Sequence, residues 1–129
     1  IAEGLGAAAN TQAALMTQGI GEMGRLIEAL GGRRETIYGL SGLGDLIVTG
    51  SSSESRNRTC GQKLGKGKGL KKALSEIPTV VEGVESAHSA HTLVKTTKIK
   101  APLLEAIWRV VHRDARPDLI ISALGFGKR

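Results

Sequence analysis

Apolar residues recur at steps of three and four along the first quarter of the chain, from Ala13 to Leu30. This spacing predicts an amphipathic helix of about twenty residues that begins near Asn10. Gly31 and Gly32 follow directly, and a glycine pair is a common end of a helix. Further glycines lie inside the segment and weaken its intrinsic helicity, so we expect neighbouring helices to pack closely against it.

The apolar positions after Gly32 predict a series of shorter helices. The segment from Glu35 to Thr49 is compatible with a strand or a buried helix, and we favour a helical turn followed by a short helix. Serine at 55 is expected to cap the next helix, and Pro102 and Pro117 are expected to begin two later ones. Alternating strand patterns are scarce and no βαβ repeat is visible, so the predicted class is all-α, with residues 1–129 as one multi-helix domain.

Composition narrows the choice of partners. The net charge is +6 and the sequence pI is about 9.8, which favours anionic partners such as nucleic acid, anionic lipid or phosphorylated small molecules. Aromatic residues make up only 2% of the chain, so the stacking surface typical of single-strand binders is missing. A membrane span and a secretory leader are not visible, and the single cysteine, Cys60, fits a reducing cytoplasm. The opening at Ile1, without Met and inside an apolar pattern, indicates a cut end.

Asp45 is the first candidate for chemistry. It lies in a glycine-rich apolar segment, Gly42-Leu43-Gly44-Asp45-Leu46, and we therefore expect its carboxylate to be at least partly buried. A buried carboxylate needs a cation or hydrogen-bond donors nearby. Taken alone, the residue fits a helix cap or an internal acceptor as well as a functional acid.

The second candidate is the tripeptide Ser55-Arg56-Asn57, which follows a serine-rich stretch, residues 50–53, with the composition of a loop. A helix that begins here would bring free backbone N–H groups, a hydroxyl, a guanidinium and a carboxamide to one point. Arginine suits a phosphate because its planar donors bind two oxygens at once. A solvated capping sequence is the alternative interpretation of the same three residues.

These blocks, taken together, resemble a known family. The segment 39–46, Gly-Leu-Ser-Gly-Leu-Gly-Asp-Leu, then Ser-Arg-Asn at 55–57 and Val-Val-Glu-Gly-Val at 80–84 are similar in order and spacing to bacterial-type NAD(P)-dependent glycerol-3-phosphate dehydrogenase. The likeness extends over nearly the whole chain, although residues 50–54 follow the family's loop only loosely. It implies an all-α domain of the type found at the C-terminus of 6-phosphogluconate dehydrogenase.

The resemblance also implies an activity. Members of this family interconvert sn-glycerol 3-phosphate and dihydroxyacetone phosphate with NAD or NADP, for glycerophospholipid synthesis. Their N-terminal Rossmann domain holds the cofactor, and its glycine-rich fingerprint has no counterpart here. The family's catalytic lysine is expected just upstream of Ile1, so this chain alone is expected to be inactive. A cytoplasmic homodimer is the assembly that the likeness suggests.

Site residues are carried over in the same way. The resemblance implies that Asp45 acts in catalysis and contacts the reacting end of the substrate, and that Ser55, Arg56 and Asn57 bind the substrate. It further implies that Arg56 also lies near the cofactor and that the cofactor contacts residues of the third block, which are Val80 and Glu82. A metal ion is not expected, because His88 and His91 share a helix face without a third ligand in sight.

Two alternatives stay open on the sequence alone. One is the helical domain of another small-substrate NAD(P) dehydrogenase. The other is a basic helical module for nucleic acid, which the lysine run from Lys63 to Lys72 also fits, although we expect no nucleic-acid partner. The same lysine run is also compatible with steering of phosphorylated ligands towards a cleft, or with a simple solvated face.

Overall fold

The computed structural model describes residues 1–125, which form helices and no strand, and this confirms the predicted all-α class. The last four residues of the predicted domain, 126–129, lie outside the described part. Besides seven α-helices there are two short elements, a 3₁₀ helix η1 (Arg34–Tyr38) and a π-helical turn η2 (Leu40–Gly44). The α-helices are α1 (Ala9–Ala29), α2 (Asp45–Ser51), α3 (Arg56–Gly65), α4 (Leu70–Ser75), α5 (Glu82–Thr97), α6 (Pro102–His112) and α7 (Leu119–Ser122).

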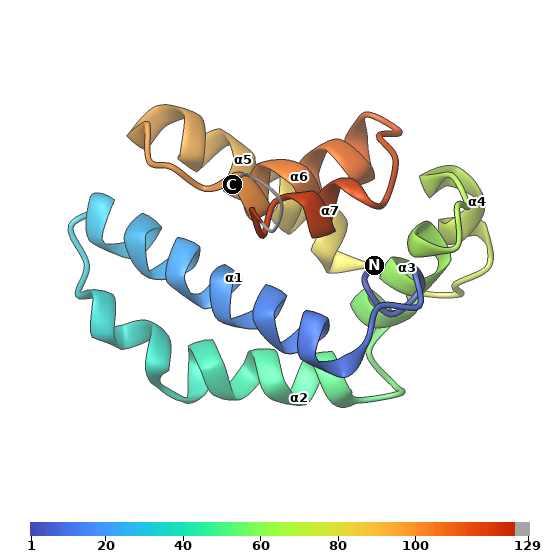
Figure 1. Ribbon diagram of the computed structural model, residues 1–129, viewed down its shortest axis with the longest axis horizontal. Coiled ribbons are helices and arrows are strands. Elements are labelled where there is room, and N and C mark those ends of the chain that lie inside the picture. Colours follow the sequence, from blue (N-terminus) through green and yellow to red (C-terminus); the bar gives the residue numbers. More distant parts are fainter. Residues whose placement is uncertain (126–129) are drawn as a thin grey trace.

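The long helix α1 separates two groups of elements (Figure 1). On one side it packs against η1, which leads through η2 into α2; on the other side it packs against α5 and α6. The helices α3 and α4 lie at one end of the molecule, and the start of α5 reaches α3 there. Segments 26 residues apart in the sequence, at Asn57 and Gly83, are brought together by this arrangement.

The centre of the core is α6. Four of its side chains are buried, and they pack with buried residues of α3 and α4 and with Ile120 of α7. The four are Leu103, Ala106, Val110 and Val111. The expected close packing at the glycines of α1 is present at two of them: Gly24 faces Arg34 and Ile37 of η1, and Gly19 faces Leu103 of α6. The small residues let both neighbours approach α1.

Most predicted helix ends are confirmed. The chain leaves α1 through Gly31, whose φ of 85° is in the left-handed region that glycine adopts without strain. The hydroxyl of Ser55 caps α3 by accepting a hydrogen bond from the backbone N–H of Arg58 at 3.2 Å. Pro102 is the first residue of α6, where its missing N–H costs nothing.

Three predicted boundaries are wrong. The stretch 50–53 is not all loop, because α2 continues through Ser51, whose hydroxyl donates back to the carbonyl of Ile47. The apolar positions Leu70, Ala73, Leu74 and Ile77 predict a small helix that ends at Pro78, but α4 ends at Ser75, whose hydroxyl donates to the carbonyl of Lys72. The last helix starts at Leu119 and not at Pro117, since the N–H groups of Leu119 and Ile120 close tighter turns.

In the part of the chain that the structure describes, none of the helices combines the length and apolar character needed to cross a lipid bilayer.

Candidate functional site

The N-terminus of α3 carries the predicted tripeptide. Ser55 is the N-cap, and Arg56 and Asn57 are the first two helical residues. Their backbone N–H groups have no acceptor among residues 1–125, because the first cap bond goes to Arg58 and the next N–H, of Thr59, donates to the carbonyl of Ser55. The free donors and the helix dipole make this end of α3 electropositive.

A hollow of about 290 Å³ lies against this helix end. It is lined by Ser55, Arg56 and Asn57 from α3, by Glu82 from α5, and by α2 and the loop that follows it. Four of the six residues predicted for the site therefore share one hollow. Residues that the sequence argument missed also line it, namely Val48, Thr49, Ser52 and Glu54.

The first turn of α5 closes the hollow from a second direction. The guanidinium of Arg56 lies 3.8 Å from the carboxylate of Glu82, and both side chains are largely exposed. Next to this pair the backbone N–H of Gly83 donates to Oδ1 of Asn57 at 2.8 Å. Since Val81, the N-cap residue of α5, provides no side-chain cap, Asn57 caps that helix from α3. Two helix N-termini thus meet at one place.

Asp45 lies elsewhere than expected. It is the first residue of α2, it is exposed, and no residue between 1 and 125 pairs with its carboxylate, so the expected burial is wrong. The reason is that η2 and α2 lie on the surface, where Leu40, Ile47 and Val48 are exposed as well. Asp45 does not line the hollow, but Val48 and Thr49, which do, follow it by three and four residues on the same face of α2.

Val80 borders a different, apolar groove of about 560 Å³ between α1 and α5. Its side chain is 72% exposed, and Glu82 borders both this groove and the hollow at α3. Of the three residues expected to reach a cofactor, Val80 and Glu82 lie at the start of α5, open to solvent, and Arg56 lies beside Glu82. An apolar surface beside an acceptor carboxylate is suited to a ligand with a ring and hydroxyl groups.

A partly buried ion pair between Arg58 and Glu3 joins α3 to the N-terminal segment. Arg58 donates two hydrogen bonds to the carboxylate of Glu3, from Nε at 2.9 Å and from a terminal nitrogen at 2.7 Å. The hydrogen bonds from Arg58 hold the pKa of Glu3 below its usual range. This paired fork joins the N-terminal turn to the helix that carries the tripeptide.

Known proteins match this chain over nearly all of its length. The family model described as "NAD-dependent glycerol-3-phosphate dehydrogenase C-terminus" matches residues 1–122. The chain belongs to this family.

Relatives with curated names agree. Glycerol-3-phosphate dehydrogenase [NAD(P)+] of Clostridium botulinum, strain Eklund 17B, is 45% identical over 124 residues, which are 96% of this chain and 38% of that enzyme. The enzyme of the same name from Thermoanaerobacter sp., strain X514, is 48% identical over the same share of each chain. A crystal structure of glycerol-3-phosphate dehydrogenase from Coxiella burnetii is similar, with a TM-score of 0.90, 38% identity, and coverage of 99% of this chain and 39% of that one.

This member of the glycerol-3-phosphate dehydrogenase C-terminal family spans well under half the length of the relatives it matches. The elements that carry the tripeptide and the third motif all fall inside the matched residues, 1–122.

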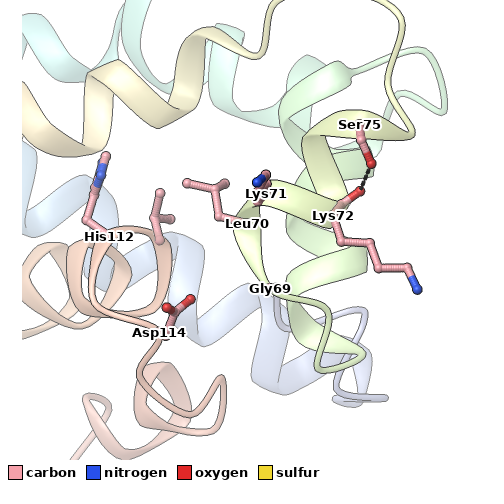
Figure 2. A pocket seen from close by; sticks show the side chains of 8 residues that line it. Gly69, Leu70, Lys71, Lys72, Ser75, His112 and Asp114 are labelled. Atoms are coloured by element: carbon pink, nitrogen blue, oxygen red, sulfur yellow. Dashed lines mark hydrogen bonds between the residues drawn. The ribbon is translucent and has the colours of Figure 1, made fainter.

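A larger hollow, of about 730 Å³, lies away from the predicted residues (Figure 2). It is lined by Lys71, Lys72 and Ser75 of α4 and by His112 and Asp114, although the side chain of Lys72 points away from His112 and Asp114 in Figure 2. Two other lysines of the basic run are engaged, because Lys63 and Lys68 both bind the carboxylate of Glu76. The lysine run is thus partly a structural network and partly an exposed face.

The histidines and the cysteine serve packing in this family member. His91 stacks on Trp108 at 3.6 Å between ring centroids and contacts Glu105 at 2.9 Å, while His112 bonds the carbonyl of Val84. Within residues 1–125 no three His, Cys, Asp or Glu side chains are arranged to hold a metal ion. Cys60 is buried, and burial raises the pKa of its thiol, which disfavours the reactive thiolate.

Proposed function

We infer that this chain is the substrate-binding part of a longer enzyme that interconverts sn-glycerol 3-phosphate and dihydroxyacetone phosphate with NAD or NADP. The observation that carries this inference is the hollow in which Ser55, Arg56 and Asn57 meet Glu82. The curated relatives have this activity in their names, and they support the choice of substrate.

The phosphate of the substrate fits the α3 end of the hollow. Two free backbone N–H groups, the guanidinium of Arg56 and the carboxamide of Asn57 all offer donors there. The N-terminus of α5 adds a second positive helix end at the same place. Glu82 is the acceptor in this set, and it is better suited to hydroxyl groups than to a phosphate.

The reacting carbon belongs at the α2 side of the hollow. Asp45 lies one turn from Thr49 on the same helix face, which supports a placement of the reacting end of a phosphate-anchored substrate towards Asp45. There it accepts a hydrogen bond from the substrate hydroxyl and orients the lysine that the family carries upstream of Ile1. Reduction of the ketone builds negative charge on oxygen, and a lysine stabilises that charge or delivers the proton.

The cofactor side is formed by the start of α5. Val80 offers an exposed apolar surface and Glu82 an exposed carboxylate, which would accept hydrogen bonds from ribose hydroxyls. The nicotinamide supplies the hydride when it is bound, while this domain holds the ketone in position. A Rossmann domain on the same polypeptide would hold the rest of the cofactor, and a cytoplasmic homodimer that supplies glycerophospholipid synthesis completes the proposal.

A chimera tests the function directly. This chain replaces the matching C-terminal part of the Coxiella burnetii enzyme, and NADH oxidation is measured with dihydroxyacetone phosphate. We expect activity in the chimera and none in the isolated chain. Arg56→Ala should lower kcat/KM by about a hundredfold, because two charge-assisted hydrogen bonds to the phosphate are lost.

The matched control is Arg33→Ala, which removes the same charge from an exposed side chain 3.8 Å from Glu35 and far from the hollow in sequence. We expect it to leave kcat/KM unchanged. Full activity of the Arg56→Ala chimera would contradict the phosphate site. A chimera that folds without activity, together with steeply salt-dependent binding of this chain to duplex DNA, would favour the nucleic-acid module instead.

A further inference from the structure

Asn57 is held by a residue that the proposed function leaves unused. Its Oδ1 accepts from the backbone N–H of Gly83, at 2.8 Å, although the two residues belong to different helices. A carboxamide has one oxygen and two N–H donors. With the oxygen engaged by Gly83, the Nδ2 donors are the groups left for a ligand in the hollow that Asn57 lines.

Only glycine allows this contact. A Cβ placed on Gly83 would lie 2.8 Å from Oδ1 and 2.9 Å from Cγ of Asn57, closer than real Cβ atoms come to other heavy atoms. The side chain of Asn57 is short and is fixed to the start of α3, so it has little freedom to retreat without leaving the N–H of Gly83. An alanine at position 83 therefore displaces the carboxamide.

We propose that Gly83 is a positioning residue for the phosphate hollow, which sets the orientation of the Asn57 carboxamide so that its N–H donors are available to the anion. This deepens the proposed function and rests on it. Without the Gly83 N–H the carboxamide can rotate by half a turn and present its oxygen, and an acceptor facing a phosphate repels it. This positioning requires no charged group, because it uses a backbone donor in the first turn of α5.

The change does not lower the intrinsic helix propensity of α5. Gly83 is the second residue of the helix, where alanine has the higher helix propensity, so a loss of affinity in Gly83→Ala does not come from a poorer helix. Gly69 provides a matched control, because it precedes α4 at the surface and a Cβ there would meet nothing within 4 Å.

Steady-state kinetics of the full-length enzyme that carries this chain test the proposal. The phosphate group keeps its charge during hydride transfer, so a lost contact to it weakens substrate and transition state alike and raises KM without lowering kcat. We expect Gly83→Ala to raise KM for dihydroxyacetone phosphate by about tenfold, with kcat within about twofold of wild type. Gly69→Ala should keep the wild-type KM.

A double-mutant cycle shows whether Gly83 acts through Asn57. Asn57→Ala should raise KM about as much as Gly83→Ala, and the double variant should be no worse than Asn57→Ala within about twofold. Effects that multiply, to about a hundredfold, would overturn the proposal, since Gly83 would then act by another route. A wild-type KM in Gly83→Ala would also overturn it.

A second pair of variants applies even if Gly83→Ala does not fold. Asn57→Asp keeps an oxygen for the Gly83 N–H but loses the donors, so it should keep the Tm of wild type and raise KM. Asn57→Ala loses both and should lower Tm by a few degrees. Equal Tm values for the two variants would contradict the capping of α5 by the side-chain oxygen of Asn57.

The outcomes separate this proposal from the function on which it rests. If wild type does not reduce dihydroxyacetone phosphate, or if Arg56→Ala leaves KM unchanged, the proposed function fails. If both of those results are as expected while Gly83→Ala behaves like Gly69→Ala, the function stands and the role of Gly83 is wrong.

Discussion

At the scale of single residues, Gly42 has no room for a side chain. A Cβ on Gly42 would overlap the carbonyl group of Ile37, a buried residue of η1. The overlapped atoms are backbone, so a rotamer change does not relieve the clash. This explains the glycine in the middle of the segment 39–46, where η1 and η2 pack against each other.

Gly42→Ala should therefore lower the free energy of unfolding by about 1–3 kcal/mol, because η1 and η2 must move apart. Urea denaturation followed by circular dichroism measures the change. Gly44→Ala is the control within the same motif: a Cβ there makes only ordinary contacts, at 3.6 Å or more, and alanine favours the helix. Equal midpoints for the two variants would argue against the close approach at Gly42.

The candidate site was partly predictable from residue types. Ser55, Arg56 and Asn57 are neighbours in sequence, and a capping serine predicts a helix end, so their common location follows from local chemistry. The exposure of Asp45 was not predictable, because it depends on which face of α2 other elements cover. The bond between Asn57 and Gly83 joins residues 26 apart, and sequence spacing alone gives no sign of it.

At the scale of elements, α6 is capped by a residue of α1. Glu22 is fully buried and accepts hydrogen bonds from the N–H groups of Leu103 and Leu104, at 3.0 and 2.9 Å, and from the side chain of Gln18. These N–H groups are the second and third of α6, and Pro102 before them has none. A carboxylate at this position also complements the helix dipole.

Glu22→Leu should lower the free energy of unfolding by about 3–5 kcal/mol, because two buried N–H groups lose their acceptor and the helix dipole its counter-charge. Glu22→Gln keeps one acceptor oxygen and should lower it less, by about 1–3 kcal/mol. Urea midpoints of the three proteins at one pH give the order. A stability of Glu22→Leu at or above that of wild type would show that the cap contributes nothing.

The helices themselves were largely predictable, and their ends less so. The three- and four-residue spacing in α6 reflects a face that is buried in the structure. In α1 the spacing predicted the helix but not its buried face: Ala13 and Leu30, the ends of the expected stripe, are exposed, and the buried Leu15 and Leu26 lie beside it. The end of α2 and the start of α7 depend on single hydrogen bonds of Ser51 and of the turn after Arg116. Composition at those places is equally compatible with loop and helix.

At the scale of the whole molecule, Glu76 joins the end of α4 to α3 and to the loop between them. Lys63 of α3 donates to its carboxylate, and Lys68 donates to both carboxylate oxygens, at 2.7 and 2.8 Å. The hydrogen bonds from the two lysines lower the pKa of Glu76 from 4.5 to about 2. Because the folded pKa lies below the unfolded value, the carboxylate stabilises the fold above pH 4.5, and the effect is lost as the pH falls towards 2.

The urea midpoint of wild type should therefore decrease as the pH is lowered from 4.5 to 2. The midpoint of Glu76→Gln should decrease less over the same interval. Some acid dependence remains in the variant, since the pKa of Glu3 is also lowered. At pH 7 the variant should be less stable than wild type. Parallel midpoint curves for the two proteins across this interval would contradict the role of Glu76.

The stacking of His91 of α5 on Trp108 of α6 allows the contact between these two helices to be followed by tryptophan fluorescence. The chain has a single tryptophan, so all indole emission comes from this contact, with the guanidinium of Arg113 5.1 Å from the ring centre. Separation of α5 from α6 would change the colour and the intensity of that emission without any attached dye. Trp108 is therefore an intrinsic fluorescent reporter for the packing of α5, whose first turn borders the hollow at the N-terminus of α3.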